Sequence, residues 1–321
     1  MELNSPMRRR TFTRALSGAI AAAALPSVLL AQSRKPIRIG AAISLSGRYS
    51  DSAAFIRDGY KLFIDETNAA GGIGGRPLEL VVYDDASSPD TGRVLAERLI
   101  NRDEVSLILG PYSSPITDAI AGVCERAQVP MLASIASDAG IWERRVLKWT
   151  FQAFLSSTYD QESFLSIALT RQCIERGLNV KGFHFITASE GASKSALGTN
   201  VAGIFGRSAW EPTLKSAANQ RFVAAFQKQY DRAPSYHAAT AYASGQVAGA
   251  ALSTTTDKAG LQKFFATQKV NTVMGNYQVN DRGIQVGYHY VGVQWQGDRA
   301  VVVWPDAERQ ASPIWPKPRW T

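Results

Sequence analysis

The chain has little of the chemistry on which most enzymes and metal proteins depend. Its 321 residues include 2 cysteines and 3 histidines. The histidines His184, His237 and His289 lie far apart and lack the spacing of metal ligands. The sequence shows no Ser–His–acid order and no glycine-flanked nucleophile. We therefore expect a protein that is not an enzyme, with no catalytic residue, no metal ion and no cofactor.

A block of basic residues is also missing, except at the amino-terminal end. Without residues 1–31, the 35 basic residues of the chain fall to 31 and the 27 acidic residues to 26. The remaining excess of positive charge is spread along the sequence. A nucleic-acid-binding surface needs clustered lysine and arginine, so we expect no nucleic-acid partner.

The two cysteines, Cys124 and Cys173, are far apart in segments that read as helices. An oxidising compartment would allow them to form a disulfide. Two buried free thiols are the favoured alternative, because cysteine is among the residues most often buried.

Residues 1–31 are typical of a cleavable export signal. A basic cluster at 8–14 precedes an apolar run at 15–31, which ends in Ala31-Gln32-Ser33. Serine, glycine and proline interrupt this run, and it is shorter than the ~20 apolar residues that span a bilayer. Arg9-Arg10-Thr11-Phe12 also resembles a twin-arginine motif. We expect export to the periplasm, through either the Sec or the twin-arginine route.

Apolar segments after the signal alternate between the periods of strands and of helices. A chain of ~290 residues favours two domains, and the alternation predicts a parallel sheet with helices on both faces. Ligands of such sheets bind beyond the carboxyl ends of the strands. The expected strands are 37–45, 78–83, 105–109 and 129–133, and the expected helices are 53–68, 91–102 and 116–127.

One loop at such a strand end carries polar groups suited to an anion. In Gly110-Pro111-Tyr112-Ser113-Ser114-Pro115, Ser114 is a suitable helix N-cap and Pro115 a suitable first helical residue. The free N–H groups of a helix start attract a carboxylate, and the hydroxyls of Ser113 and Ser114 would add hydrogen bonds. Plain capping of a helix is the alternative, and both interpretations remain open.

Several motifs in order along the chain resemble type I periplasmic binding proteins of the leucine/isoleucine/valine-binding family. The resemblance covers most of the chain after the signal. The segment Asn-Ala-Ala-Gly-Gly-Ile-Gly-Gly-Arg-Pro at 68–77 is the most specific of these motifs. The others include Ser44-Leu45-Ser46-Gly47, Asp84-Asp85, the 110–114 loop, Trp210-Glu211-Pro212 and Tyr236-His237-Ala238-Ala239.

The resemblance implies an α/β fold with two lobes, each a mostly parallel sheet flanked by helices. It implies a first lobe at 36–150 plus 241–280 and a shortened, incomplete second lobe at 151–240 plus 281–321. It further implies a periplasmic monomer of an ABC importer that captures an amino acid, branched-chain above all, or a related small carboxylate or amide. The expected partners are this ligand, the permease and the ATPase of the permease.

Ligand contacts follow from the same resemblance. Ser113 and Ser114 would hold the ligand carboxylate, and the loop at Ala136, Ser137 and Asp138 would hold its ammonium group. Glu190 would complete the ammonium site from the second lobe, although a solvated loop carboxylate is an equal alternative. Two aromatic residues, Tyr49 and Trp142, would pack against the ligand side chain or simply belong to the core.

The second lobe departs from the family pattern because it is short. A βα unit takes ~30 residues, and about two units are missing after residue 154. The sequence leaves open a minimal lobe that still closes, a lobe completed by a partner chain, and a degenerate paralogue that binds nothing. A ligand-sensing regulatory binder is a further alternative, because the same fold serves both roles.

Overall fold

The computed structural model describes residues 35–321 except 157–162 and 186–190. The predicted signal at 1–31 and the candidate Glu190 lie outside the described residues. Contacts divide the chain into two units, residues 1–35 and residues 36–321. Within the described part of the chain, no helix has the length and apolar character that crossing a membrane requires.

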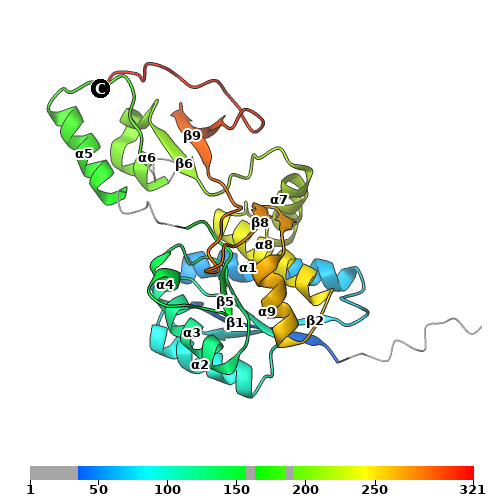
Figure 1. The fold of residues 1–321 in the computed structure, drawn as a ribbon. Helices are drawn as coiled ribbons and strands as arrows, with labels where there is room; N and C mark the ends of the chain where they lie inside the picture. Colours follow the sequence, from blue (N-terminus) through cyan, green and yellow to red (C-terminus); the bar gives the residue numbers. More distant parts are fainter. Residues whose placement is uncertain (1–34, 157–162, 186–190) are drawn as a thin grey trace, which may run out of the picture. The chain divides into compact units, whose positions relative to one another are not determined.

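Five parallel strands form the first sheet, in the order β2-β1-β3-β4-β5 (Figure 1). Each of the strands β1 to β4 leads into a helix that returns the chain to the end of the sheet where the next strand begins, and parallel pairing requires such a crossover. The predicted α/β fold class is therefore confirmed. The strands are β1 (Ile37–Ile43), β2 (Leu78–Asp84), β3 (Leu107–Leu109), β4 (Met131–Ala133) and β5 (Thr150–Gln152). The helices between them are α1 (Ser50–Ala69), α2 (Pro89–Asn101), α3 (Ser114–Ala127) and the short α4 (Gly140–Glu143).

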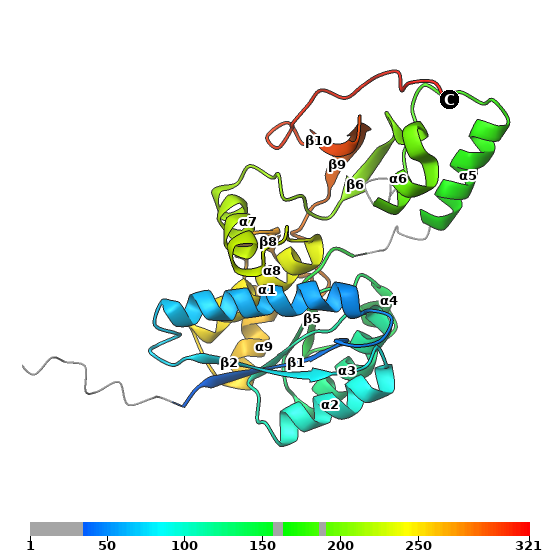
Figure 2. The same ribbon diagram turned by 180° about the vertical axis from the view of Figure 1, so that it is seen from behind.

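Successive side chains of the first sheet enter two different cores. Ile39 and Ile43 of β1 lie in one core with α1, whereas Ala42 lies in a second core with α2 and α3. Neighbouring residues of a strand point to opposite faces, so both faces of a parallel sheet must be apolar. Figure 2 shows α1 and α8 (Tyr236–Leu252) on one side of the sheet and α2 and α3 on the other.

Helices α1 and α8 approach each other closely because glycines line their contact. A Cβ atom added at Gly59 would lie 2.4 Å from the carbonyl oxygen of Ala238 and 2.9 Å from Cβ of Ala241. On the other helix, Gly245 makes room for the ring of Phe63 in the same way. Glycine at these positions therefore sets the distance between the two helices.

A pair of glycine substitutions tests this contact. Gly59→Ala is expected to lower the free energy of unfolding by about 1–3 kcal/mol, because the new methyl group overpacks against α8. Gly122→Ala in α3 is the matched control, since a Cβ there would meet only arginine side-chain ends at 3.7 Å or more. It is expected to stabilise the protein by about 0.5–1 kcal/mol. Urea unfolding measures both, and equal effects of the two variants would disprove close helix contact.

Helix α7 (Ala217–Tyr230) packs against α1 and joins the core of the first sheet. Phe222 and Phe226 on its inner face are buried there. The domain boundaries expected from the sequence put this helix in the second lobe, yet its apolar contacts are with helices of the first sheet. The boundaries stay a prediction, but the packing favours moving α7 into the first lobe.

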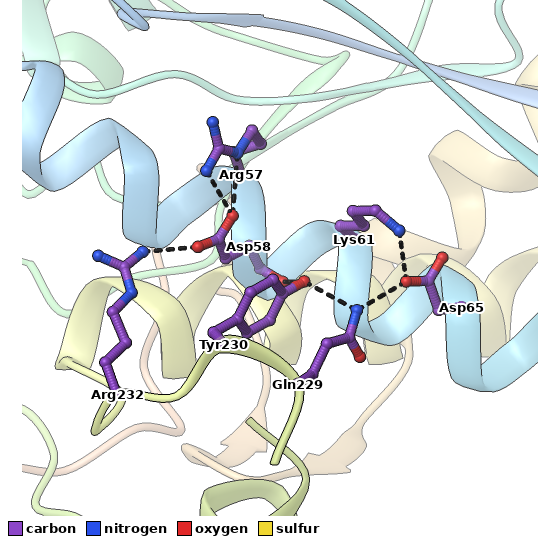
Figure 3. Close-up of polar contacts among 7 residues, drawn as sticks. All are labelled: Arg57, Asp58, Lys61, Asp65, Gln229, Tyr230 and Arg232. Carbon is purple, nitrogen blue, oxygen red and sulfur yellow. Dashed lines mark hydrogen bonds and ion pairs between the residues drawn. The ribbon is translucent and has the colours of Figure 1, made fainter. Parts of the chain in front are cut away.

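A polar network joins α1 to the end of α7 (Figure 3). The carboxylate of Asp58 is 5% exposed and accepts hydrogen bonds from Arg57 Nε at 2.9 Å and Arg232 Nη2 at 2.5 Å. The Tyr230 hydroxyl donates to the backbone oxygen of Asp58 at 3.0 Å. Burial raises the pKa of Tyr230, so this hydroxyl keeps its proton. These contacts fix where the chain leaves α7.

The rest of the first-sheet region is helix α9 (Lys258–Thr267) and a hairpin of β7 (Val270–Thr272) and β8 (Gly275–Tyr277). Leu261 and Phe265 of α9 are buried in the core that contains α1 and α8.

The second sheet has three strands in the order β10-β9-β6. Both of its strand pairs are antiparallel, whereas an isolated bridge between His184 and Phe205 is parallel, so these three strands differ from the mostly parallel sheet expected for the second lobe. A two-residue turn joins β9 to β10, and such a short connection imposes antiparallel pairing. The elements are β6 (Phe205–Ser208), β9 (Val291–Gln296), β10 (Arg299–Trp304), α5 (Ser163–Glu175), α6 (Gly191–Leu197) and the 3₁₀ turn η2 (Gly198–Val201).

Both cysteines are buried free thiols, which decides between the two alternatives that the sequence left open. Cys124 belongs to α3 and Cys173 to α5. Burial raises the pKa of the Cys124 thiol, so it stays protonated at neutral pH.

Candidate ligand-binding site

The carboxyl ends of the five parallel strands bring four polar loops to one edge of the first sheet. They follow β1, β2, β3 and β4, as the alternation of strands and helices predicts. Buried hydrogen bonds join them: the hydroxyl of Tyr60 donates to the carbonyl of Gly110 at 2.7 Å and accepts from Ser134 Oγ at 2.6 Å. Tyr60 of α1 thus connects the loops after β3 and β4.

The loops after β1 and β2 are joined by a buried pair. Ser44 Oγ donates to Asp85 Oδ1 at 2.6 Å, and both residues are fully buried. Desolvation raises the pKa of the Asp85 carboxyl. Its neighbour Asp84 is exposed, and desolvation there is outweighed by hydrogen bonds from Ser46 and Ala86, which lower the pKa of Asp84. These carboxylates join the two loops, while Asp85 Oδ2 is buried without a hydrogen-bond partner among the described residues.

Ser113 is the residue whose position best fits a ligand contact. It is the N-cap of the 14-residue helix α3, one position earlier than the cap expected from the sequence, and Ser114 begins the helix. The Ser113 side chain makes no capping hydrogen bond. Its Oγ is buried and, among the described residues, has no hydrogen-bond partner. Plain capping therefore does not explain this serine.

Ser114 and the 136–138 loop lie side by side. Ser114 Oγ accepts a hydrogen bond from the backbone N–H of Asp138 at 3.3 Å. The amide of Gln152 donates to the carbonyls of Ala136 at 2.9 Å and Ser137 at 3.4 Å. A carbonyl oxygen has two lone pairs, so each can accept a further bond. The structure therefore brings together the residues expected for the carboxylate and those expected for the ammonium.

Three aromatic rings next to these loops contact one another in sequence. Tyr49 meets Tyr112 edge to face at 5.1 Å between ring centroids, and Tyr112 meets His237 in the same way at 5.1 Å. Tyr49, Tyr112 and His237 are all half-buried. We call these three residues the aromatic row.

Trp142 does not belong to this row, which corrects one candidate. Its side chain is 1% exposed in the core between the first sheet and α3, and its indole N–H donates to the carbonyl of Thr150 at 2.9 Å. Of the two alternatives for Trp142, the structure therefore supports the core position.

Two members of the aromatic row, Tyr112 and His237, were missed as candidates in the sequence. Both stand inside motifs that carry the family resemblance, which is the signal that could have found them. His237 Nε2 is buried without a hydrogen-bond partner among the described residues. Burial lowers the pKa of His237 to about 4, so the ring is neutral at neutral pH.

The buried histidine predicts a pH dependence of stability. An unfolded histidine has a pKa of about 6.5, so between pH 6.5 and 4 the unfolded state takes up a proton that the folded state excludes. Above pH 6.5 this histidine does not lower the free energy of unfolding. Below pH 6.5 the free energy of unfolding decreases as the pH falls, by at most about 1.4 kcal/mol per pH unit.

We expect His237→Phe to remove this contribution to the pH dependence of the free energy of unfolding. His289→Phe, at an exposed ring, is the control and should keep it. Equal slopes in the two variants, from urea unfolding at pH 7 and pH 5, would contradict the assignment.

No group of three or more histidine, cysteine, aspartate or glutamate side chains that could hold a metal ion occurs among the described residues.

Comparison with known proteins identifies the family. A family model described as "Periplasmic binding protein" matches residues 36–163 and 165–300. The chain therefore belongs to the periplasmic binding protein family.

Curated relatives match over a shorter stretch. The leucine-, isoleucine-, valine-, threonine- and alanine-binding protein of Pseudomonas aeruginosa is 31% identical over 108 residues, 34% of this chain. The Leu/Ile/Val-binding protein homolog 8 of Brucella abortus is 33% identical over 120 residues, 37% of this chain. Each match spans 29% of the relative.

Solved structures show the same fold at low sequence identity. A putative branched-chain amino acid ABC transporter from Rhodospirillum rubrum has a TM-score of 0.69 and 16% identity, over 83% of this chain and 99% of that one. LivJ of Streptococcus pneumoniae, in complex with isoleucine, has a TM-score of 0.66 and 18% identity over 88% and 100%. A solute-binding protein of Rhodopseudomonas palustris, in complex with 3,4-dihydroxy benzoic acid, has a TM-score of 0.67 and 16% identity over 89% and 99%.

Proposed function

We propose that the chain is an exported, non-enzymatic solute-binding protein that captures a small carboxylate at the carboxyl edge of its first sheet. It would work in the periplasm as a monomer and deliver its ligand to an ABC permease with its ATPase. The observation that carries this proposal is the Ser113 hydroxyl, which is buried, unpartnered within the described chain and placed at the start of a long helix.

A carboxylate is the ligand group that this arrangement suits best. The first N–H groups of a helix lack partners within the helix and lie at the positive end of its dipole. A carboxylate oxygen at α3 would accept from these N–H groups and from Ser113 Oγ together. Isoleucine and dihydroxybenzoate, the ligands of two solved relatives, share this group and little else.

The rest of the ligand should be apolar or aromatic. Tyr49, Tyr112 and the neutral His237 offer ring edges beside Ser113. One cation lies beside these rings, because the guanidinium of Arg48 is 4.6 Å from the ring centroid of Tyr49. A branched-chain amino acid would use the 136–138 carbonyls for its ammonium group, whereas an aromatic acid would use the ring edges alone. We favour the branched-chain amino acid because both curated relatives carry that specificity in their names.

Calorimetry on the purified protein without residues 1–31 tests the proposal. The panel is leucine, isoleucine, valine, benzoate and 3,4-dihydroxybenzoate, with leucinamide and benzamide as uncharged partners. We expect at least one acid to bind and its amide to bind far more weakly. An acid and amide of equal affinity would contradict carboxylate recognition.

Absence of binding across the whole panel would favour the degenerate paralogue that the short second lobe suggests. A regulatory binder would bind ligand equally well. It is distinguished by whether deletion of the gene abolishes uptake of the radiolabelled ligand, as the transport role requires, or leaves uptake intact.

A further inference from the structure

Helices cover one face of the second sheet, and the other face carries a cavity. Side chains from one face meet α6 and η2 in a small core of Phe185, Leu197, Val201, Ile204 and Trp295. Adjacent residues of a strand point to opposite sides, so Phe205 and Arg207 face away from this core. On that other side lies an open cavity of about 570 Å³, formed by β6, β9, β10 and the chain near residues 309–313.

The volume and lining of this cavity are those of a small-molecule site. Ligand pockets typically measure about 300–1,000 Å³ and are mostly apolar with a few polar groups. Here the apolar wall includes Phe205, Tyr290, Val303 and Trp304. Trp304 is 59% exposed, so a large flat indole borders the opening.

The charged part of the lining is positive. Arg207 and Arg309 line the cavity together with His184, and no carboxylate is among the described residues that do so. Arg309 is held by an ion pair with Asp306 at the rim. The guanidinium of Arg207 lies 3.8 Å from the ring centroid of Tyr290, with Nε and Nη2 buried. Stacking of this kind orients a guanidinium, and its positive charge attracts a carboxylate.

We propose that this cavity, here called the second-sheet pocket, binds an aromatic or apolar small molecule that carries a carboxylate. The charged group would meet Arg207, and the ring would lie between Tyr290 and Trp304. This site is separate from the one at Ser113, because the described residues of its lining belong to the second sheet and the segments next to it. The proposal for this pocket therefore does not depend on the proposed function.

Nuclear magnetic resonance with 1-naphthoate and 1-naphthamide tests the proposal. The probes share one ring system and differ in charge. The protein contains 7 tryptophans, so labelled indole N–H groups give a spectrum with few signals, and Trp304→Phe assigns the one in the pocket. We expect naphthoate to shift the Trp304 signal and leave that of Trp142 in place. Naphthamide should bind at least about tenfold more weakly, as loss of a hydrogen-bonded charge predicts.

Two variants separate this site from the other. Arg207→Met keeps an apolar stem against Tyr290 but removes the charge, and it should weaken naphthoate at least about tenfold with little effect on naphthamide. Ser113→Ala should leave the Trp304 shift unchanged. The proposal is wrong if Trp304 does not respond, if acid and amide bind equally, or if Arg207→Met binds naphthoate like the wild type.

A second copy of the chain is the rival occupant of this surface. Sedimentation velocity over a range of protein concentrations distinguishes it. A dimer that dissociates in Trp304→Asp and is indifferent to naphthoate would replace the small-molecule proposal.

Discussion

Ser113→Ala is expected to weaken binding of the carboxylate ligand by about 10- to 100-fold. A hydrogen bond to a charged group contributes about 1.5–3 kcal/mol, and 1.4 kcal/mol is a factor of ten in affinity. The stability of the unliganded protein should hardly change, because Ser113 Oγ makes no hydrogen bond among the described residues. Calorimetry with the acid of the panel that binds most tightly measures the loss of affinity. Urea unfolding measures the free energy of unfolding.

Ser216→Ala is the matched control, and its pattern should be the reverse. Ser216 is also a helix N-cap, but its Oγ accepts from the backbone N–H of Asn219 at 3.1 Å, at the start of α7. Loss of such a cap costs about 1 kcal/mol of stability, and ligand affinity should remain that of the wild type. If Ser113→Ala lost stability and kept its affinity, Ser113 would be an ordinary cap.

Phe226→Ala should have the largest effect on stability, a loss of about 3–5 kcal/mol. The ring is fully buried and meets Phe222 at 5.9 Å and Tyr230 at 4.7 Å between centroids. Its removal leaves a cavity between α7 and α1 that the surrounding helices can only partly fill. Urea unfolding at 25 °C gives the loss as a lower midpoint at unchanged slope.

Val94→Ala provides the comparison for this loss. Val94 is an apolar residue of α2 that is 54% exposed, so its truncation should change stability by no more than about 0.5 kcal/mol. A loss below about 1 kcal/mol for Phe226→Ala would mean that α7 is not docked on α1.

The first sheet could be predicted well from the sequence because its signals are local. Apolar periodicity located the strands and helices from β1 to β4, and the crossover helices required parallel pairing. Ser113 and Ser114 were found because they follow a strand and begin a helix. Local pattern cannot say which hydroxyl is already used, and only packing shows that Ser114 accepts from Asp138 whereas Ser113 is free of partners in the described chain.

Features that depend on tertiary contacts could not be predicted. The sequence leaves Trp142 as a core residue or a ligand contact, and the hydrogen bond from its indole N–H to Thr150 decides for the core. The docking of α7 on α1 depends on Phe222 and Phe226 meeting residues more than 150 positions away. The antiparallel second sheet follows from the tight turn between β9 and β10, which an expectation drawn from family resemblance does not consider.

A crystal structure of the protein with the tightest acid of the panel would test the central claim most directly. We predict a carboxylate oxygen of the ligand within hydrogen-bond distance of Ser113 Oγ and of the first N–H groups of α3. The apolar part of the ligand should lie against Tyr49, Tyr112 and His237. A ligand whose carboxylate lies away from the start of α3, with Ser113 Oγ unchanged, would contradict the account.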